Sequence, residues 1–142
     1  FVNWLIELIK LLNNDENSSP TYMQIRNFYE QDLDMLFKYK QNEYINKILK
    51  SINFFECFNK EIYKYTARVL FNYNLTALAE SYIKKSLEIF YNDPETHYIL
   101  GEIYLKSKEY LKAKNEFKRA DEVIKGYLPA KEKLYIIKDF CY

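Results

Sequence analysis

The chain has 142 residues, and its 21 Lys and Arg residues nearly balance 20 Asp and Glu residues, for a net charge of +1. That balance provides no general field for nucleic acid or anionic lipid, so we expect neither a nucleic-acid nor a membrane partner. With two glycines and three prolines, the composition disfavours folds that need many tight turns and favours a helical domain.

The first segment, from Phe1 to Leu12, is predicted to be an amphipathic helix with a wide apolar face. Glu7, Lys10 and Asn13 interrupt its apolar run, which therefore falls short of the roughly 18 residues of a membrane span. The segment has no initial methionine and no basic region ahead of it, so a signal peptide is disfavoured. We therefore expect a fragment of a longer cytoplasmic protein.

The next predicted unit is a helix pair over residues 20–58. A polar stretch ends at Ser19-Pro20, which is typical of a helix N-terminus, and apolar residues at helical spacing predict a helix to about Tyr39. A short link precedes a third helix, which is predicted to run without a break from Ile45 to about Phe58. So short a link favours an antiparallel pair.

Two further helix pairs are predicted over residues 60–93 and 94–127. The first pair is joined at Asn74, which is predicted to cap the second helix, and the other pair follows Asn92-Asp93-Pro94. Gly126 ends the last of these helices, and Pro129 opens a final helix to about Phe140. About eight helices and no strand-like alternation predict an all-α fold.

The chain resembles itself when it is shifted so that position 63 falls on position 97. Large residues then align with large ones and small with small, as in the pairs Tyr63 and His97, Ala67 and Gly101, Leu70 and Tyr104, Ala79 and Ala113, Ile83 and Phe117, and Ser86 and Ala120. Small residues at Gly101 and Ala113 are expected where two helices of one hairpin approach closely. Large residues at Tyr104 and Phe117 are expected to fill the space between neighbouring hairpins.

This pattern resembles the tetratricopeptide repeat, a helix-turn-helix unit with the same period. The segment from Pro94 to Lys125 carries the resemblance through Leu100-Gly101, Tyr104, Tyr110, Ala113, Phe117 and Ala120. The resemblance implies one α-solenoid domain over residues 1–142, with antiparallel hairpins stacked on one another. In that domain 1–19 and 128–142 are end elements, the latter a capping helix, and 20–58 is a degenerate hairpin with bulky Leu33 and Ile45 at small positions.

Sequence motifs for catalysis, metals and cofactors are lacking, so we expect a protein that is not an enzyme and needs no cofactor. The two glycines stand alone, which disfavours a phosphate loop or a nucleophile elbow. The single histidine, His97, falls where the family has an aromatic residue, and we expect it to pack. Cys57 and Cys141 lack the paired spacing of a zinc or redox motif and fit a reduced intracellular setting.

The resemblance implies that the first helices of successive hairpins line a concave groove that binds an extended peptide or a partner's helix. The implied peptide-binding residues are Glu61, Lys64, Arg68, Phe71 and Asn72 from one hairpin, and Glu95, Tyr98, Glu102, Leu105 and Lys106 from the next. Lys64 and Arg68 lie one helical turn apart, so both heads could reach a single carboxylate of a ligand. The alternative is an ordinary charged face in which Glu61 is their internal partner.

The resulting functional hypothesis is a protein-interaction scaffold for a peptide with both signs of charge and an apolar anchor. A second hypothesis makes these repeats the C-terminal accessory region of a larger enzyme, such as a bacterial glycosyltransferase. A third has the helices self-associate through an exposed apolar face. That face would be Phe1 to Leu12 or the terminal residues Tyr135, Ile136, Phe140 and Tyr142.

Overall fold

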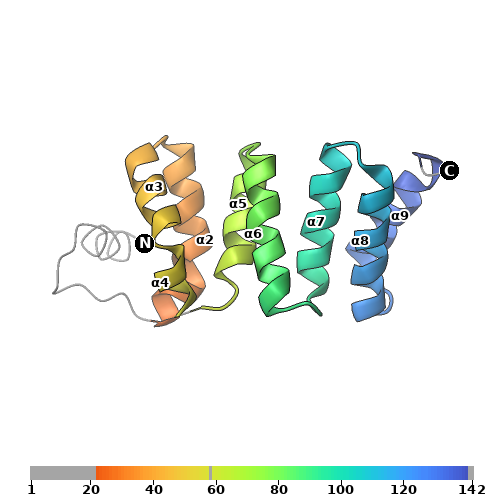
Figure 1. The fold of residues 1–142 in the computed structure, drawn as a ribbon, viewed down its shortest axis with the longest axis horizontal. Helices are drawn as coiled ribbons and strands as arrows, with labels where there is room; N and C mark the ends of the chain where they lie inside the picture. The colour runs from red at the N-terminus through yellow and green to blue at the C-terminus, as the bar shows by residue number, and fades with distance from the viewer. Residues whose placement is uncertain (1–21, 58, 141–142) are drawn as a thin grey trace. The chain divides into compact units, whose positions relative to one another are not determined.

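The computed structural model describes residues 22–57 and 59–140 and, in that part of the chain, contains eight α-helices, one short 3-10 helix and no strand (Figure 1). The predicted all-α class is confirmed. The chain divides into two compact units, of which the first ends at Val69 and the second begins at Leu70. The predicted helix at 1–12 and the helix start at Ser19-Pro20 lie outside the described residues.

Unit 1 consists of α2 (Tyr22–Lys38), α3 (Asn42–Lys50), α4 (Ile52–Glu56) and the first part of α5 (Ile62–Asn72). Its helices bury one apolar face each, as their spacing predicts. The buried side chains include Tyr29, Leu33, Leu36, Ile45, Ile48, Ile52, Phe55, Ile62, Tyr63 and Ala67. A buried hydrogen bond 2.8 Å long joins the Tyr29 hydroxyl on α2 to Thr66 Oγ1 on α5.

The prediction of one unbroken helix from Ile45 to Phe58 is wrong, because Ser51 separates α3 from α4. Ser51 has φ −100° and ψ 11°, and its N–H lies 3.1 Å from the Lys47 carbonyl oxygen and 3.0 Å from that of Ile48. Such a shared bond tightens the last turn of a helix. Ile48 and Ile52 remain buried on either side of the break, so the apolar spacing gave no sign of it.

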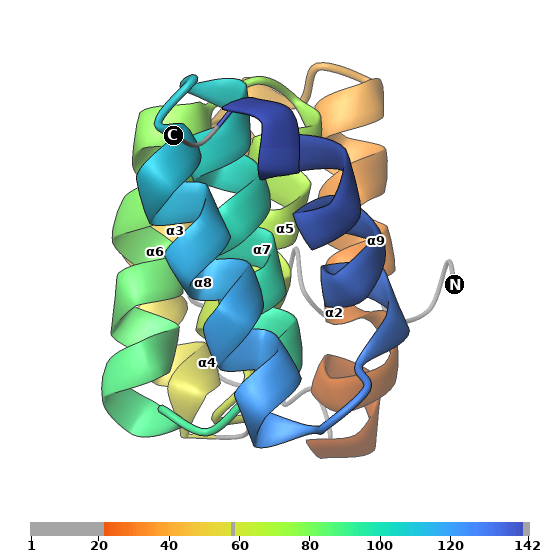
Figure 2. The same ribbon diagram turned by 90° about the vertical axis from the view of Figure 1, so that its right-hand side faces the viewer.

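Unit 2 contains the end of α5, α6 (Thr76–Ile89), α7 (Pro94–Lys106), α8 (Tyr110–Val123), α9 (Leu128–Ile137) and η1 (Lys138–Phe140). Within this unit α6 contacts α7, α7 contacts α8, and α8 contacts α9 (Figure 2). Asp93 caps α7, since its Oδ1 accepts hydrogen bonds from the N–H groups of Glu95 and Thr96. The expected helix start at Asn92-Asp93-Pro94 is thus confirmed.

The turns that follow α2, α5 and α7 share one backbone geometry. Each has a non-glycine residue with positive φ, and these residues, Lys40, Asn74 and Lys108, are separated by one repeat period each. In the last turn the N–H of Lys108 bonds to the Leu105 carbonyl and that of Glu109 to the Tyr104 carbonyl, at 3.0 and 2.9 Å. This is a Schellman-type helix end, and it recurs even after α2, in the hairpin with the weakest sequence pattern.

Asn74 was expected to be the N-cap of α6, and this prediction is wrong. Leu75 occupies the N-cap position without a side-chain hydrogen bond, whereas Asn74 is the left-handed residue that ends α5, with φ 65°. Asparagine tolerates that backbone conformation, which is why it suits this turn.

We expect Lys108→Gly to raise the free energy of unfolding by about 0.5–1 kcal/mol, because glycine adopts positive φ without steric cost. Urea unfolding of the full chain measures the change. Lys118→Gly, at an exposed position inside α8, is the matched control and should cost about 1 kcal/mol. Equal effects of the two substitutions would contradict the proposed turn strain.

Gly101 allows α7 and α8 to approach closely. A Cβ added to Gly101 would lie 2.5 Å from Phe117 Cε1, and Phe117 is fully buried. We therefore expect Gly101→Val to lower the free energy of unfolding by about 2 kcal/mol through overpacking. Combining it with Phe117→Leu should cost less than the sum of the two single changes, and strict additivity would contradict the close contact.

Candidate functional site

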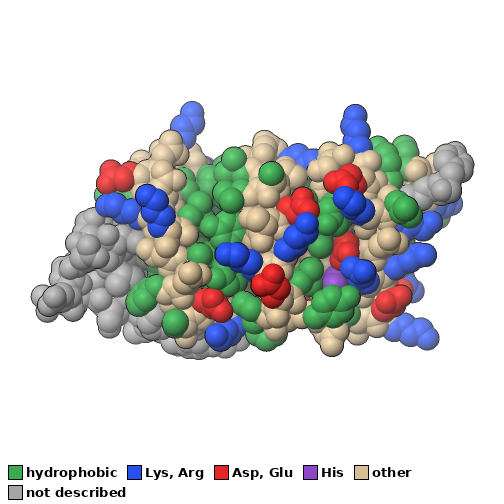
Figure 3. All heavy atoms as spheres, in the orientation of Figure 1, with side chains coloured by type: hydrophobic (Ala, Val, Ile, Leu, Met, Phe, Trp, Pro, Cys, Tyr) green, Lys and Arg blue, Asp and Glu red, His purple; other side chains and the backbone are tan. Residues whose placement is uncertain are grey.

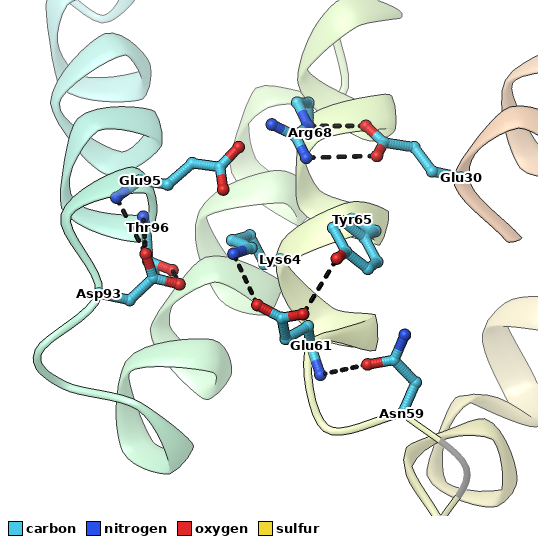
Figure 4. Close-up of polar contacts among 9 residues, drawn as sticks. All are labelled: Glu30, Asn59, Glu61, Lys64, Tyr65, Arg68, Asp93, Glu95 and Thr96. Carbon is cyan, nitrogen blue, oxygen red and sulfur yellow. Dashed lines mark hydrogen bonds and ion pairs between the residues drawn. The ribbon is translucent and has the colours of Figure 1, made fainter. Parts of the chain in front are cut away.

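Three of the predicted site residues, Glu61, Lys64 and Arg68, belong to unit 1. Lys64 is buried, and its Nζ lies 3.0 Å from Glu61 Oε1. The Tyr65 hydroxyl donates a hydrogen bond to the other oxygen of the same carboxylate, at 3.0 Å (Figure 4). Glu61 is also held through its backbone, since Asn59 Oδ1 accepts the Glu61 N–H at 2.9 Å.

Arg68 forms an ion pair with Glu30 on α2. Its Nε and Nη2 donate to the two oxygens of Glu30 on α2, at 2.6 and 3.2 Å, in a bidentate pair (Figure 4). The two basic groups that were expected to share a ligand carboxylate are therefore each engaged within the protein. Reversing the charge of either would break an internal pair, so such a variant would mix loss of binding with loss of stability.

The remaining predicted residues belong to unit 2, where α7 carries five of them. Tyr98, Glu102 and Leu105 are half-buried and Lys106 is exposed, and their spacing of three or four positions places them along one side of α7. Glu95 lies at the start of the helix, in its first turn. Phe71 and Asn72 lie in the last turn of α5, in the same unit.

Tyr98 and Glu102 form a small network with α9. The Tyr98 hydroxyl donates to Glu102 Oε1 at 3.0 Å, and Lys133 Nζ on α9 lies 3.0 Å from the same oxygen. The Tyr98 ring also packs against Phe117 and Tyr127, with centroid distances of 5.6 and 6.3 Å. Burial, assisted by the charge and hydrogen bond of Glu102, raises the pKa of Tyr98.

Lys106 is held at the other end of the same side of α7. Its ammonium group bonds to Asn74 Oδ1 and lies 5.0 Å from the centroid of the Phe71 ring. Lys106 and Phe71, both predicted site residues, thus lie side by side, and Asn74 and Lys133 are contact residues that were not predicted. The sequence indicates these two contacts only through the repeat. Lys106 follows Asn74 by nearly one repeat period, and Lys133 follows Glu102 by a similar number of positions.

A second polar cluster surrounds His97 between α7 and α8. The ring is fully buried, with Nδ1 2.8 Å from Glu116 Oε2 and Nε2 2.7 Å from the Tyr91 carbonyl oxygen. The Tyr91 carbonyl oxygen can only accept a hydrogen bond, so Nε2 donates to it. Arg119 Nη1 donates to the other oxygen of Glu116 at 2.6 Å.

His97 is buried and each of its ring nitrogens has a hydrogen-bond partner, so it packs inside the protein, as we expected. His97 also lines a polar surface hollow, and its purple atoms are visible in Figure 3. The hollow is lined by Tyr91, Asn92, His97, Arg119, Glu122 and Val123. Glu116 was not singled out from the sequence, although a glutamate between Ala113 and Phe117 on the buried side of α8 was a signal.

No group of three or more His, Cys, Asp or Glu side chains suited to a metal ion occurs within residues 22–57 and 59–140. In the same ranges every helix is too short or too polar to cross a membrane. A scan of the chain against models of known protein families finds no match, and a search of curated proteins finds none either.

Proposed function

We propose that the chain is a protein-interaction scaffold of the tetratricopeptide-repeat kind, and that the exposed side of α7 binds an extended peptide of a partner protein. Support for the repeat assignment comes from the left-handed turns at Lys40, Asn74 and Lys108, which recur with the repeat period, and from the Gly101–Phe117 contact. The turns recur with the period of the sequence pattern that resembles the family, and the close contact lies at one of its small residues.

The observation that carries the proposal is the ordered row of side chains along α7. Tyr98, Glu102 and Lys106 are each held by contacts within unit 2, yet all three remain partly or fully exposed. Side chains that are already ordered lose little entropy when a ligand binds, so such a row favours recognition. Its acidic and basic groups also limit which peptides fit.

The length of the row matches a short extended peptide. The separation of Tyr98 and Lys106 along the helix corresponds to about 12 Å, which is the length of about four residues of an extended chain. Glu102 Oε2 carries no hydrogen bond within the described chain and is suited to a basic group of the peptide. Lys106 suits an acidic group, and Leu105 with the Tyr98 ring suits an apolar anchor.

Selection of peptides from a random displayed library on the full chain tests the proposal. We expect the selected peptides to combine an apolar residue with both signs of charge within about four positions. Leu105→Glu and Lys106→Glu should each weaken binding of a selected peptide by about tenfold or more, because each change removes a favourable contact and adds a repulsive charge.

Lys118→Glu on α8 is the matched control for Lys106→Glu, since both replace an exposed helical lysine with glutamate. It should leave peptide affinity unchanged. Circular dichroism and urea unfolding establish that all three variants keep their helices. Equal affinity for the α7 and α8 variants, or failure to select any peptide, would contradict binding at α7.

A further inference from the structure

The last helix of unit 2 has an exposed apolar stripe. Leu128, Tyr135 and Ile136 have exposed fractions of 64%, 71% and 57%, which are high for large apolar side chains. Tyr135 and Ile136 line a surface hollow together with Lys131 and Glu132, so these four residues share one side of α9. In Figure 2 α9 lies near the viewer, with no described helix in front of it.

The opposite side of α9 is anchored in unit 2. Ala130 and Ile137 are buried, and Lys133 pairs with Glu102 on α7. These contacts fix which side of α9 remains exposed, so the stripe is a defined surface and not the product of a loosely attached helix.

A following helix could not pack on this stripe as closely as α8 packs on α7. Tyr135 follows Gly101 by one repeat period and so occupies the equivalent position. At Gly101 even a single added carbon would collide with Phe117 of the following helix. A tyrosine at the equivalent position therefore excludes the close helix contact of the preceding hairpin and favours a different occupant.

We propose that the occupant is a second copy of this chain, which pairs through α9 in an antiparallel, two-fold arrangement centred on Tyr135. The charges on the stripe are complementary to themselves in that arrangement. Residues equally far from Tyr135 face each other across the axis, so Glu132 meets Lys138 of the second copy and Lys131 meets Asp139. By symmetry each of these two opposite-charge contacts occurs twice, and together they flank an apolar centre made by Tyr135 and Ile136.

The side chains concerned are available for these contacts. Lys131, Glu132, Lys138 and Asp139 are exposed, and no ion pair is formed by any of them among the described residues. Lys138 Nζ lies 4.1 Å from the centroid of the Tyr135 ring, which places its charge beside the apolar centre. An interface made by one helix from each copy is small, which favours a weak dimer.

Sedimentation velocity of the full chain over a range up to millimolar concentration tests the proposal. The expected result is a monomer–dimer equilibrium that Ile136→Glu abolishes. Leu111→Glu, at an exposed leucine on α8, should leave it unchanged. A monomer at every concentration overturns the proposal, and so does a dimer that Ile136→Glu leaves intact. Helicity is checked by circular dichroism for each variant.

Charge exchange at Glu132 and Lys138 tests the antiparallel register. Glu132→Lys alone and Lys138→Glu alone each create two like-charge contacts in a homodimer, so each should weaken dimerisation by about tenfold. When the two variants are mixed, every such contact becomes attractive, and dimers should form again. Absence of recovery in the mixture overturns the register. The outcome is independent of peptide binding at α7, which uses other residues.

Discussion

Replacing Asp32 with asparagine should make the stability of the protein less dependent on pH, with the largest gain in alkaline solution. Asp32 on α2 is fully buried, and neither of its carboxylate oxygens has a hydrogen-bond partner among the residues that the structure describes. Burial raises its pKa to about 7. A carboxyl with that pKa binds a proton in the folded state at pH values where the unfolded chain, with a pKa near 3.9, has lost it.

The sign of the effect follows from this difference. The stabilising contribution of protonated Asp32 is complete below the unfolded pKa and is lost progressively as the pH rises through 7. Between about pH 5 and about pH 9 the wild-type protein should lose about 3 kcal/mol that Asp32→Asn does not lose. Urea unfolding of both proteins over this range measures the difference, with Asp34→Asn as a control for loss of one negative charge.

A constant difference between wild type and Asp32→Asn across the pH range would contradict the burial of a neutral carboxyl.

The repeat register explains why the position is unusual. Asp32, Thr66 and Leu100 occupy equivalent positions in the first helices of the three successive hairpins. Both Asp32 and Thr66 are fully buried at a position where the third copy has leucine.

The second large effect is expected at the buried pair of His97 and Glu116. Glu116→Ile or His97→Phe alone should each lower the free energy of unfolding by about 3 kcal/mol, because each leaves a buried polar partner without its hydrogen bond. The double variant should cost far less than the sum of these values, since both polar groups are removed together. Urea unfolding of the four proteins gives the coupling energy.

Residues similar to those of the double variant already occur at equivalent positions elsewhere in the chain. The positions one and two repeat periods before His97 hold Tyr63 and Tyr29, both buried, and the position two periods before Glu116 holds Ile48. An aromatic with an aliphatic residue therefore already occupies the equivalent positions of the first hairpin. Single effects that simply add in the double variant would contradict a coupled pair.

Helix positions in the second half of the chain could be predicted closely from the sequence. Strong end signals were present there, such as Asp93 before Pro94 and Gly126 after α8, and each acts through local backbone hydrogen bonds or a positive φ. Ser51 is different, because a break that keeps the same face buried does not change the apolar spacing. The left-handed residues Lys40 and Lys108 also carried no signal, since lysine has no preference for that conformation.

The placement of the candidate site residues on helices could be predicted, but their contacts could not. Helical periodicity places Tyr98, Glu102 and Lys106 on one side of a helix, and the resemblance to the repeat family indicated that this side lines a groove. The pairing of Arg68 with Glu30 joins residues that are far apart in the sequence and lie on different helices. Opposite charges are so numerous in this chain that sequence spacing did not distinguish this partner from others.

Magnetic resonance with a spin-labelled peptide tests the proposed binding at α7 most directly. A peptide selected on the full chain, labelled at one end, should broaden the backbone amide signals of Tyr98, Glu102, Leu105 and Lys106. Signals from Lys118, which is exposed on α8, should keep their intensity. Broadening centred on α8, or equal loss of intensity along the whole chain, would contradict a peptide-binding surface on α7.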